Sequence, residues 1–241
     1  AAATGEYIAF VDGDDYVEPD MYEFLYDLIQ AHDADIAQCG LYSDDNGVIT
    51  TTADGAVHTY TGEAVLRAYI MGGPDWIAVY NKLYPRELFL KEKLDFDLKI
   101  AEDRLTNYCL LRNVRKIVFC NEAKYAYVTR PNSAMRRPYP VEWLTGDMTC
   151  CRYIMEEQKD TGLFVYAKAA YLTSCLAHLM YILYTGLNTE YYDELMSEVR
   201  HNIPFLIKNR RLFRRADRIK AVLLLTNKRL AKWVYTRHRD Q

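Results

Sequence analysis

The sequence predicts an α/β fold over residues 1–137, followed by an all-helical region over residues 138–241. Up to about Arg137, short apolar runs alternate with helical patterns, which is typical of a sheet covered by helices. From about Pro140 onward, apolar residues recur only at helical spacing. The charge changes along the chain as well. Residues 208–241 hold 12 Lys or Arg and 2 acidic residues, a net +10, whereas residues 1–207 carry −13.

The first elements are predicted from an apolar run and a turn. The run Tyr7–Val11 predicts a buried strand that ends at Asp-Gly. Pro19 then turns the chain. Asp20 and Glu23 have the spacing of a capping box, with Asp in place of Ser, which predicts a helix to about Ala31.

The remaining elements follow from the same signals. In the α/β part we expect strands over 36–42 and 48–52 joined by an Asp-Asn-Gly hairpin at 45–47, a helix over 62–71 capped by Thr61, a helix over 101–113, and strands over 116–120 and 125–129. In the second part we expect helices over 143–158, 164–187 and 191–208. The stretch 169–187 is the most apolar, but His178 and several hydroxyl groups favour a buried helix over a membrane span.

Composition narrows the class of protein. The 241 residues are 50% hydrophobic and 26% charged, which is typical of one large globular domain or a domain with an appendage. The six cysteines form no C-x-x-C pair and the five histidines no metal-binding pair, which disfavours a zinc site. Scattered cysteines suit a reducing cytosol. No signal-peptide pattern is visible, so we expect a cytoplasmic location.

The acidic turn VDGDDYVEPD crowds Asp12, Asp14, Asp15 and Glu18 into a few positions. Such carboxylates repel one another unless something offsets their charge. An EF-hand loop is excluded, because Tyr16 and the residue after it stand where Asp or Asn and Gly are required. A haloacid dehalogenase motif, D-x-D-x-[TV], fits only its first part. A divalent-metal site for a nucleotide diphosphate fits the i, i+2 spacing, and a turn that merely ends a strand is the structural alternative.

Four segments resemble one family in its own order. ATGEYIAFVDGDDYVEPDMYEFL resembles the central motif of family 2 glycosyltransferases of the GT-A fold, of the bacterial polysaccharide type. Val79–Phe89, Leu94–Leu111 and Lys116–Met135 resemble that family's later motifs. In the family, a nucleotide-binding half precedes the ATGEY segment. Because the chain starts at Ala1, the resemblance implies a partial GT-A domain, with a mixed, Rossmann-like sheet that carries the metal motif and the acceptor half.

The resemblance implies a metal-dependent, inverting transfer of a sugar from a nucleotide-diphosphate sugar to a glycan or lipid-linked glycan. It assigns Asp14 to Mn²⁺ or Mg²⁺, and Asp12 to the metal or the donor ribose. Asp15 is expected to be a hydrogen-bonded turn residue. Asp103 takes the place of the general base, with Glu102 beside it in substrate binding. Acidic residues also favour a first helical turn for stability alone.

The resemblance also assigns four further residues to substrate binding. Arg130 and Ser133 lie in a predicted loop, where an arginine could pair with diphosphate oxygens or simply belong to a surface turn. Trp76 and Lys82 flank the expected acceptor region. Trp76 either stacks on a sugar or packs in the core. If the donor half is absent, the alternative function is a non-catalytic binding or membrane-associating remnant.

The basic segment 208–241 has three interpretations: a solvated helical face, a contact with nucleic acid, or a contact with an anionic membrane surface. Apolar residues at helical spacing beside Lys and Arg favour a helix that lies among lipid headgroups. No nucleic-acid motif is present, and the rest of the chain is acidic, so no nucleic-acid partner is expected. We therefore expect the protein to be peripheral at the inner face of the membrane.

Overall fold

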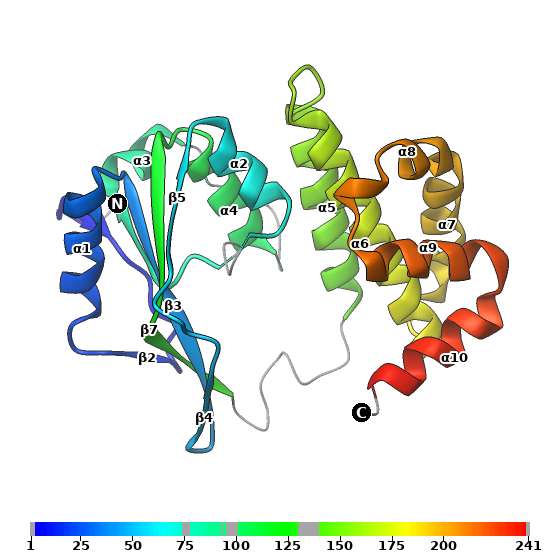
Figure 1. The fold of residues 1–241 in the computed structure, drawn as a ribbon, viewed down its shortest axis with the longest axis horizontal. Coiled ribbons are helices and arrows are strands. Elements are labelled where there is room, and N and C mark those ends of the chain that lie inside the picture. The colour runs from blue at the N-terminus through cyan, green and yellow to red at the C-terminus, as the bar shows by residue number, and fades with distance from the viewer. Residues whose placement is uncertain (1–2, 74–77, 93, 95–100, 130–139, 240–241) are drawn as a thin grey trace. The chain divides into compact units, whose positions relative to one another are not determined.

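The structure is a computed structural model of the chain. It describes residues 3–73, 78–92, 94, 101–129 and 140–239, and for residues 238 and 239 it describes the backbone alone. The chain divides into two compact units, Ala1–Tyr139 and Pro140–Gln241. The first unit is mixed α/β and the second is helical (Figure 1). The fold class predicted from the sequence is therefore confirmed.

A seven-stranded mixed sheet forms the centre of the described part of the first unit. The strands are β1 (Tyr7–Ile8), β2 (Tyr16–Val17), β3 (Ile36–Asp45), β4 (Val48–Thr51), β5 (Val57–Thr61), β6 (Lys82–Pro85) and β7 (Lys116–Thr129). Their order is β1-β6-β3-β7-β2, with β4 paired to β3 and β5 paired to β7. The central pair β3–β7 is parallel, and the other described pairs are antiparallel.

The central pair contains an irregularity at Gly40. The two strands predicted over 116–120 and 125–129 form the single strand β7, and its register with β3 shifts on both sides of Gly40. A Cβ atom at Gly40 would lie 2.9 Å from Asn121 Oδ1 and 3.2 Å from the backbone of that residue. Only glycine therefore allows the two strands to approach this closely at the bulge.

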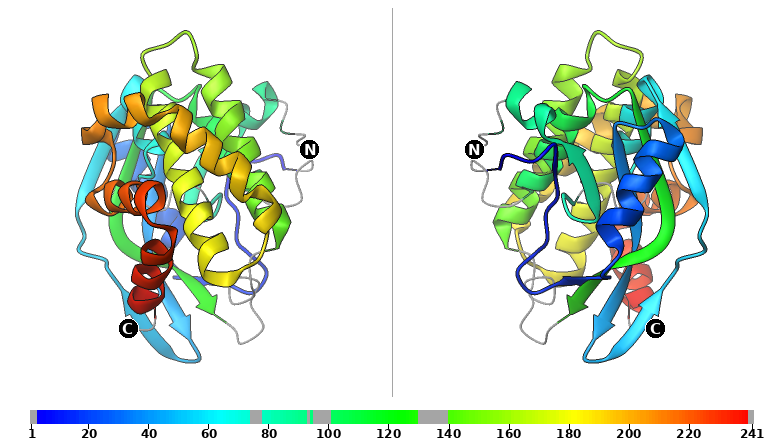
Figure 2. Two further views of the ribbon diagram at one scale, coloured as in Figure 1. Left: turned by 90° about the vertical axis from the view of Figure 1, so that its right-hand side faces the viewer. Right: turned by 90° about the vertical axis from the view of Figure 1, so that its left-hand side faces the viewer.

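Helices cover both faces of the sheet in the α/β unit. They are α1 (Met21–His32), α2 (Glu63–Ile70), α3 (Arg86–Lys91) and α4 (Glu102–Leu111). The apolar face of α1, formed by Met21, Leu25 and Ile29, packs on residues of β3 and β7 that include Ala37 and Val118. Helices α2 and α4 lie on the side of the sheet away from α1 (Figures 1 and 2). This arrangement positions the first turn of α4 beside the sheet.

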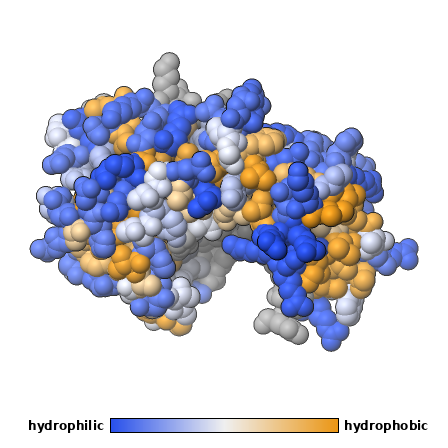
Figure 3. Space-filling model, turned by 45° about the horizontal axis from the view of Figure 1, so that its top comes forward, coloured by the Kyte–Doolittle hydropathy of each residue, from blue (hydrophilic) through white to orange (hydrophobic). Residues whose placement is uncertain are grey.

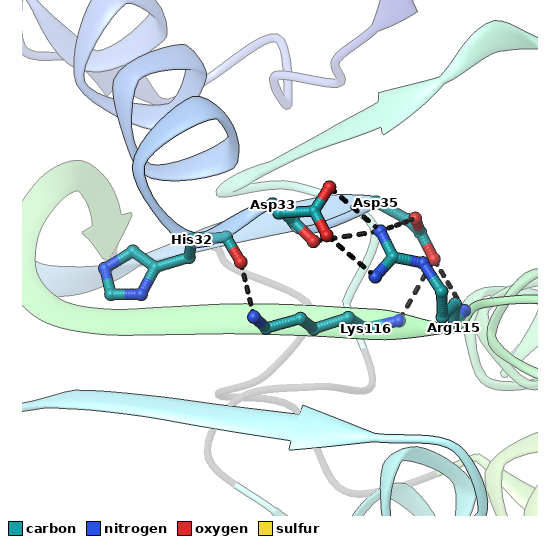
Figure 4. A network of polar contacts seen from close by, with 5 residues as sticks. All are labelled: His32, Asp33, Asp35, Arg115 and Lys116. Carbon is teal, nitrogen blue, oxygen red and sulfur yellow. Dashed lines mark hydrogen bonds and ion pairs between the residues drawn. The ribbon is translucent and has the colours of Figure 1, made fainter.

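The two ends of α1 are held by β7 and by Arg115, the residue before it. Asp20 makes no capping hydrogen bond, because its carboxylate accepts one from Lys124 Nζ at 2.7 Å, so the predicted capping box is wrong. At the other end, Arg115 pairs with Asp33 and Asp35, and Lys116 Nζ donates to the last carbonyl of α1 (Figure 4). The partners that decide both ends come from a strand distant in sequence.

Three other local expectations need correction. The strand expected over Tyr7–Val11 is only the two-residue β1, and Phe10 and Val11 are exposed, because the chain leaves the sheet edge there. Thr61 ends β5 and does not cap α2, whose N-cap is Gly62. Four short elements were not predicted: the strands β2, β5 and β6 and the helix α3. The three strands form because each pairs with a strand that is distant in the sequence.

The second unit is built around one apolar helix. Its elements are α5 (Val141–Glu157), α6 (Phe164–Thr185), η2 (Thr189–Tyr191), α7 (Tyr192–His201), α8 (Ile203–Lys208), η3 (Arg210–Leu212), α9 (Arg215–Thr226) and α10 (Lys228–Arg239). Helix α6 buries residues on several sides, among them Leu172, Leu176 and Leu179, against α5, α7, α9 and α10. The buried helix expected from the stretch 169–187 is therefore confirmed.

Polar side chains tie α5 to α6. Asp147 on α5 accepts hydrogen bonds from Ser174 and, at 2.9 Å, shares one with His178 Nε2. In the part of the chain that the structure describes, no helix combines the length and the apolar character that a membrane span requires. All six cysteines are buried, and none of them forms a disulfide bond.

Replacing Gly40 should destabilise the α/β unit. We expect Gly40→Ala to lower the free energy of unfolding by about 1–3 kcal/mol, because the added methyl group overpacks the bulge against backbone atoms. Gly13→Ala is the matched control. Nothing lies within 4 Å of its Cβ position, so a change within about 0.5 kcal/mol is expected. Urea denaturation followed by circular dichroism measures both, and equal midpoints would contradict the analysis.

Candidate functional site

The acidic turn crosses one end of the sheet. Strand β1 pairs with β6 at one edge, and β2 pairs with β7 at the other. The intervening residues 9–15 carry the three aspartates from one edge to the other. Asp15 N–H donates to Asp12 O at 3.0 Å, which closes a tight turn around Gly13 and Asp14. The turn therefore presents Asp12 and Asp14 in exposed positions.

Asp15 and Tyr125 fix the turn on β7. The Tyr125 hydroxyl donates to Asp15 Oδ2 at 2.7 Å and accepts from Asp12 N–H at 3.1 Å. Val128 N–H donates to Asp15 Oδ1 at 2.9 Å. Tyr125 is fully buried and stacks on Tyr80 with ring centroids 4.6 Å apart. Asp15 is thus the hydrogen-bonded turn residue that was expected.

The electrostatics of the turn follow from this crowding. Partial burial raises the pKa of Asp12, and the charges of Asp15 and Asp14 raise it further. The exposed carboxylates of Asp12 and Asp14 therefore lie close enough to repel each other. A cation between them would offset the repulsion.

Asp103 lies in the first turn of α4, close to the acidic turn. Burial raises the pKa of Asp103, and the charges of Glu102 and then of Asp12 raise it further. A backbone hydrogen bond from Val79 and the charge of Lys82 act in the opposite direction. Asp12 and Asp103 are far apart in the sequence, yet each carboxylate lies within electrostatic range of the other.

A buried lysine side chain lies near Asp103. Lys82 is fully buried, and its Nζ donates to Ala78 O at 2.8 Å and Asn81 Oδ1 at 3.1 Å. Asn107, one turn after Asp103 on α4, donates to the same Ala78 oxygen at 2.9 Å. Ala78, the neighbour of Val79, is therefore held both by Lys82 on β6 and by Asn107 on α4.

Two residues near the site adopt left-handed backbone conformations without being glycine. Asn81 has φ 53° and Ala101, which directly precedes α4, has φ 70°. The Asn81 side chain compensates by donating to Cys39 O on β3 at 2.7 Å. Such strained residues cluster at functional sites.

The structure brings together four of the residues predicted for the site: Asp12, Asp14, Glu102 and Asp103. Lys82 is also present, but its ammonium group donates to backbone oxygens and to Asn81 Oδ1. Trp76, Arg130 and Ser133 lie outside the described residues. Sequence reasoning missed Tyr125 and Asn107, because both act by hydrogen bonds that only the folded chain creates, and a buried tyrosine or asparagine has no signature of its own.

The carboxylates fit a divalent cation that also binds phosphate. Mg²⁺ and Mn²⁺ prefer oxygen ligands and commonly bind through one or two carboxylates plus substrate phosphates. Asp12 and Asp14 supply this donor set. Among the described residues, no group of three or more His, Cys, Asp or Glu side chains is arranged to hold a metal ion. A cation held by Asp12 and Asp14 would therefore take its remaining ligands from other sources, such as substrate phosphates or water.

Sequence comparisons agree with the family resemblance. Residues 1–90 match the model of the family described as Glycosyl transferase family 2. The uncharacterized glycosyltransferase EpsJ of Bacillus subtilis is 30% identical over 154 residues, which cover 57% of this chain and 42% of EpsJ. Glycosyltransferase GlyG of Streptococcus pneumoniae is 30% identical over 158 residues, covering 59% of this chain and 50% of GlyG. Residues 1–90 are therefore similar to glycosyltransferase family 2, in agreement with the resemblance.

The fold comparison extends over both units. The crystal structure of S. aureus TarS 1–349 in complex with UDP-GlcNAc superposes with a TM-score of 0.61, covering 98% of this chain and 69% of that chain. At 18% identity this match shows the fold alone, which is a GT-A fold followed by helices. The chain spans half or less of the length of the curated relatives named above.

The shared electrostatic environment can be tested without any activity. We expect the pKa of Asp103 to lie above the ordinary range and to fall in Asp12→Asn, because that change removes a nearby negative charge. The control is Asp14→Asn, which should shift the pKa of Asp103 less. Carboxyl ¹³C NMR titration measures both variants. If Asp12→Asn leaves the titration of Asp103 unchanged, the two carboxylates do not share a site.

Proposed function

We propose that this chain contributes the metal-binding carboxylates and the general base of a metal-dependent, inverting glycosyltransferase. The observation that carries the proposal is the meeting of Asp12 and Asp103, from distant parts of the sequence, at one end of the sheet. The family match of residues 1–90 and the names of the relatives support the class of reaction. The donor in this proposal is a nucleotide-diphosphate sugar, in line with the UDP-GlcNAc bound by TarS.

Asp103 is the base in this mechanism. Its carboxylate takes the proton from an acceptor hydroxyl as the hydroxyl oxygen attacks the anomeric carbon, and the bond to the diphosphate breaks on the opposite face. The Val79 N–H orients the carboxylate, and partial burial raises its proton affinity toward that of a useful base. Because only the ionised form accepts a proton, activity should fall as the pH drops through the raised pKa of Asp103.

Asp12 and Asp14 hold the cation in this mechanism. When bound, Mn²⁺ or Mg²⁺ neutralises the diphosphate oxygens of the donor. Asp15 and Tyr125 keep the turn on β7, and the turn keeps the two exposed carboxylates near each other. Trp76, Glu102, Arg130 and Ser133 remain proposed substrate contacts. Lys82 is better placed to hold the segment from Ala78 to Asn81 than to touch substrate directly.

The proposed acceptor is a glycan or a lipid-linked glycan, and the proposed location is the inner face of the cytoplasmic membrane. The net +10 of residues 208–241 supports attraction to an anionic leaflet. A lipid-linked acceptor would give an enzyme of this class a reason to be there.

Cation binding should depend on Asp14. We expect Mn²⁺ to bind in the presence of UDP, and the binding to be lost in Asp14→Ala, since the cation loses one of its two protein carboxylates. Isothermal titration calorimetry with Mn²⁺ and UDP measures the effect. Asp27→Ala on the exposed face of α1 is the control, and it should bind as the wild type does. Equal binding by wild type and Asp14→Ala would exclude the assignment.

Transfer should depend on Asp103. In the full-length enzyme, we expect Asp103→Asn to reduce kcat at least ~10²-fold while donor affinity is kept, because the amide keeps the shape but cannot accept a proton. Sugar transfer from a UDP-sugar and UDP binding measure the two quantities. Near-normal turnover would mean that another residue is the base. If neither wild type nor variant binds a nucleotide, the chain is a non-catalytic module.

A further inference from the structure

A groove on the helical unit lies between α8 and α9. Its volume is about 390 Å³, within the range of roughly 300–1,000 Å³ that is typical of small-molecule sites. Most of its lining is apolar and includes Leu206, Ile207, Phe213 and Val222. Phe213 is buried, whereas Ile207 is 69% and Val222 60% exposed. We refer to this feature as the α8–α9 groove.

Further apolar surface continues along α9. Ile219 is also exposed, and it lines an adjoining cavity of about 400 Å³ together with Val222 and Arg218. Exposed aliphatic side chains that are scattered singly need no explanation. Here they line the groove and its neighbour along α8 and α9. Figure 3 shows hydrophobic surface next to strongly hydrophilic surface on the helical unit. A contiguous apolar surface of this kind usually marks an interaction site.

The groove is bordered by positive charge. Arg210 and Arg218 belong to its lining. Asp217 is the acidic residue of the lining, but it is buried and its carboxylate pairs with Lys220 Nζ at 3.0 Å. Residues 203–225 hold seven Lys or Arg and this one Asp. The charge presented around the apolar groove is therefore strongly positive.

We propose that the α8–α9 groove docks onto a bilayer that contains anionic phospholipids. Ile207 and Val222 enter the acyl-chain region, and Arg210 and Arg218 pair with lipid phosphates. An apolar surface with arginines at its border matches an amphiphile with an anionic head, whereas a nucleic acid offers no apolar counterpart to the groove. The inference rests on the membrane location proposed above. It narrows the membrane-binding surface from residues 208–241 to one groove.

Vesicle co-sedimentation with the full chain tests the proposal, using phosphatidylcholine vesicles with and without phosphatidylglycerol. We expect the double variant Arg210→Glu/Arg218→Glu to lose at least about tenfold in apparent affinity for the anionic vesicles. Arg229→Glu/Lys232→Glu on α10 changes the net charge equally and should lose less than about threefold. Equal losses in the two double variants would mean that the vesicles respond to the net charge of the chain and not to the groove, and would overturn the proposal.

The apolar contribution needs its own comparison. Ile207→Glu should weaken binding, and the deficit should persist at high salt, where screening weakens the charge contribution. Val48→Glu, at an equally exposed position of β4, should bind as the wild type does. An Ile207→Glu variant with wild-type binding overturns the proposal. If Ile207→Glu loses its melting transition, the milder Val222→Ser serves in its place, with the same expected deficit.

The outcome is separable from that of the transfer reaction. No nucleotide sugar is present in the vesicle assay, so Asp103→Asn should sediment with vesicles as the wild type does, whether or not the chain supports transfer. Sedimentation of the chain without lipid would instead indicate self-association through the groove, and would overturn the proposal. Binding to neutral and anionic vesicles alike would contradict the role given to the arginines.

Discussion

The parallel pairing of β3 with β7 is the constraint on which the rest of the α/β unit depends. Strand β7 supplies Tyr125 and Val128 to the acidic turn, and Lys116 and Lys124 to the two ends of α1. Strand β3 fixes Asn81, and through it the start of β6. Because a Cβ atom at Gly40 would lie only 3.2 Å from the backbone of β7, a shift of this one pair would displace the groups that β3 and β7 supply to the site.

Charge balance is the second organising principle of the site. Several carboxylates meet at one end of the sheet, and the pKa values of Asp12 and Asp103 rise as a result of burial and mutual repulsion. The buried Lys82 offsets part of this charge, and it also holds the segment that orients Asp103. The remaining negative charge faces outward at Asp12 and Asp14, where a cation and a diphosphate would complete the balance.

The helical unit distributes its charges differently. Its core is apolar and centred on α6, and its basic residues concentrate in the last third, from α8 onward. Most of them are exposed, yet exposed aliphatic side chains lie among them at the α8–α9 groove. This combination of charge and apolar surface is the observation on which the proposed contact with an anionic membrane rests.

The sequence by itself determined the two-part architecture, helices such as α4 and α6, and the carboxylates of the candidate site, whereas the single helix predicted over 191–208 is divided into α7 and α8. Those features depend on periodicity and on motifs, which are local: α6 and α4 fall close to their predicted ranges, and Asp12 and Asp103 stand in recognisable segments. Tertiary structure alone decided β2, β5 and β6, the loss of the capping box to Lys124, and the roles of Tyr125 and Lys82. The physical reason is that each of these depends on a partner distant in the chain, and hydrogen-bond partners at that distance leave no periodic trace in the sequence.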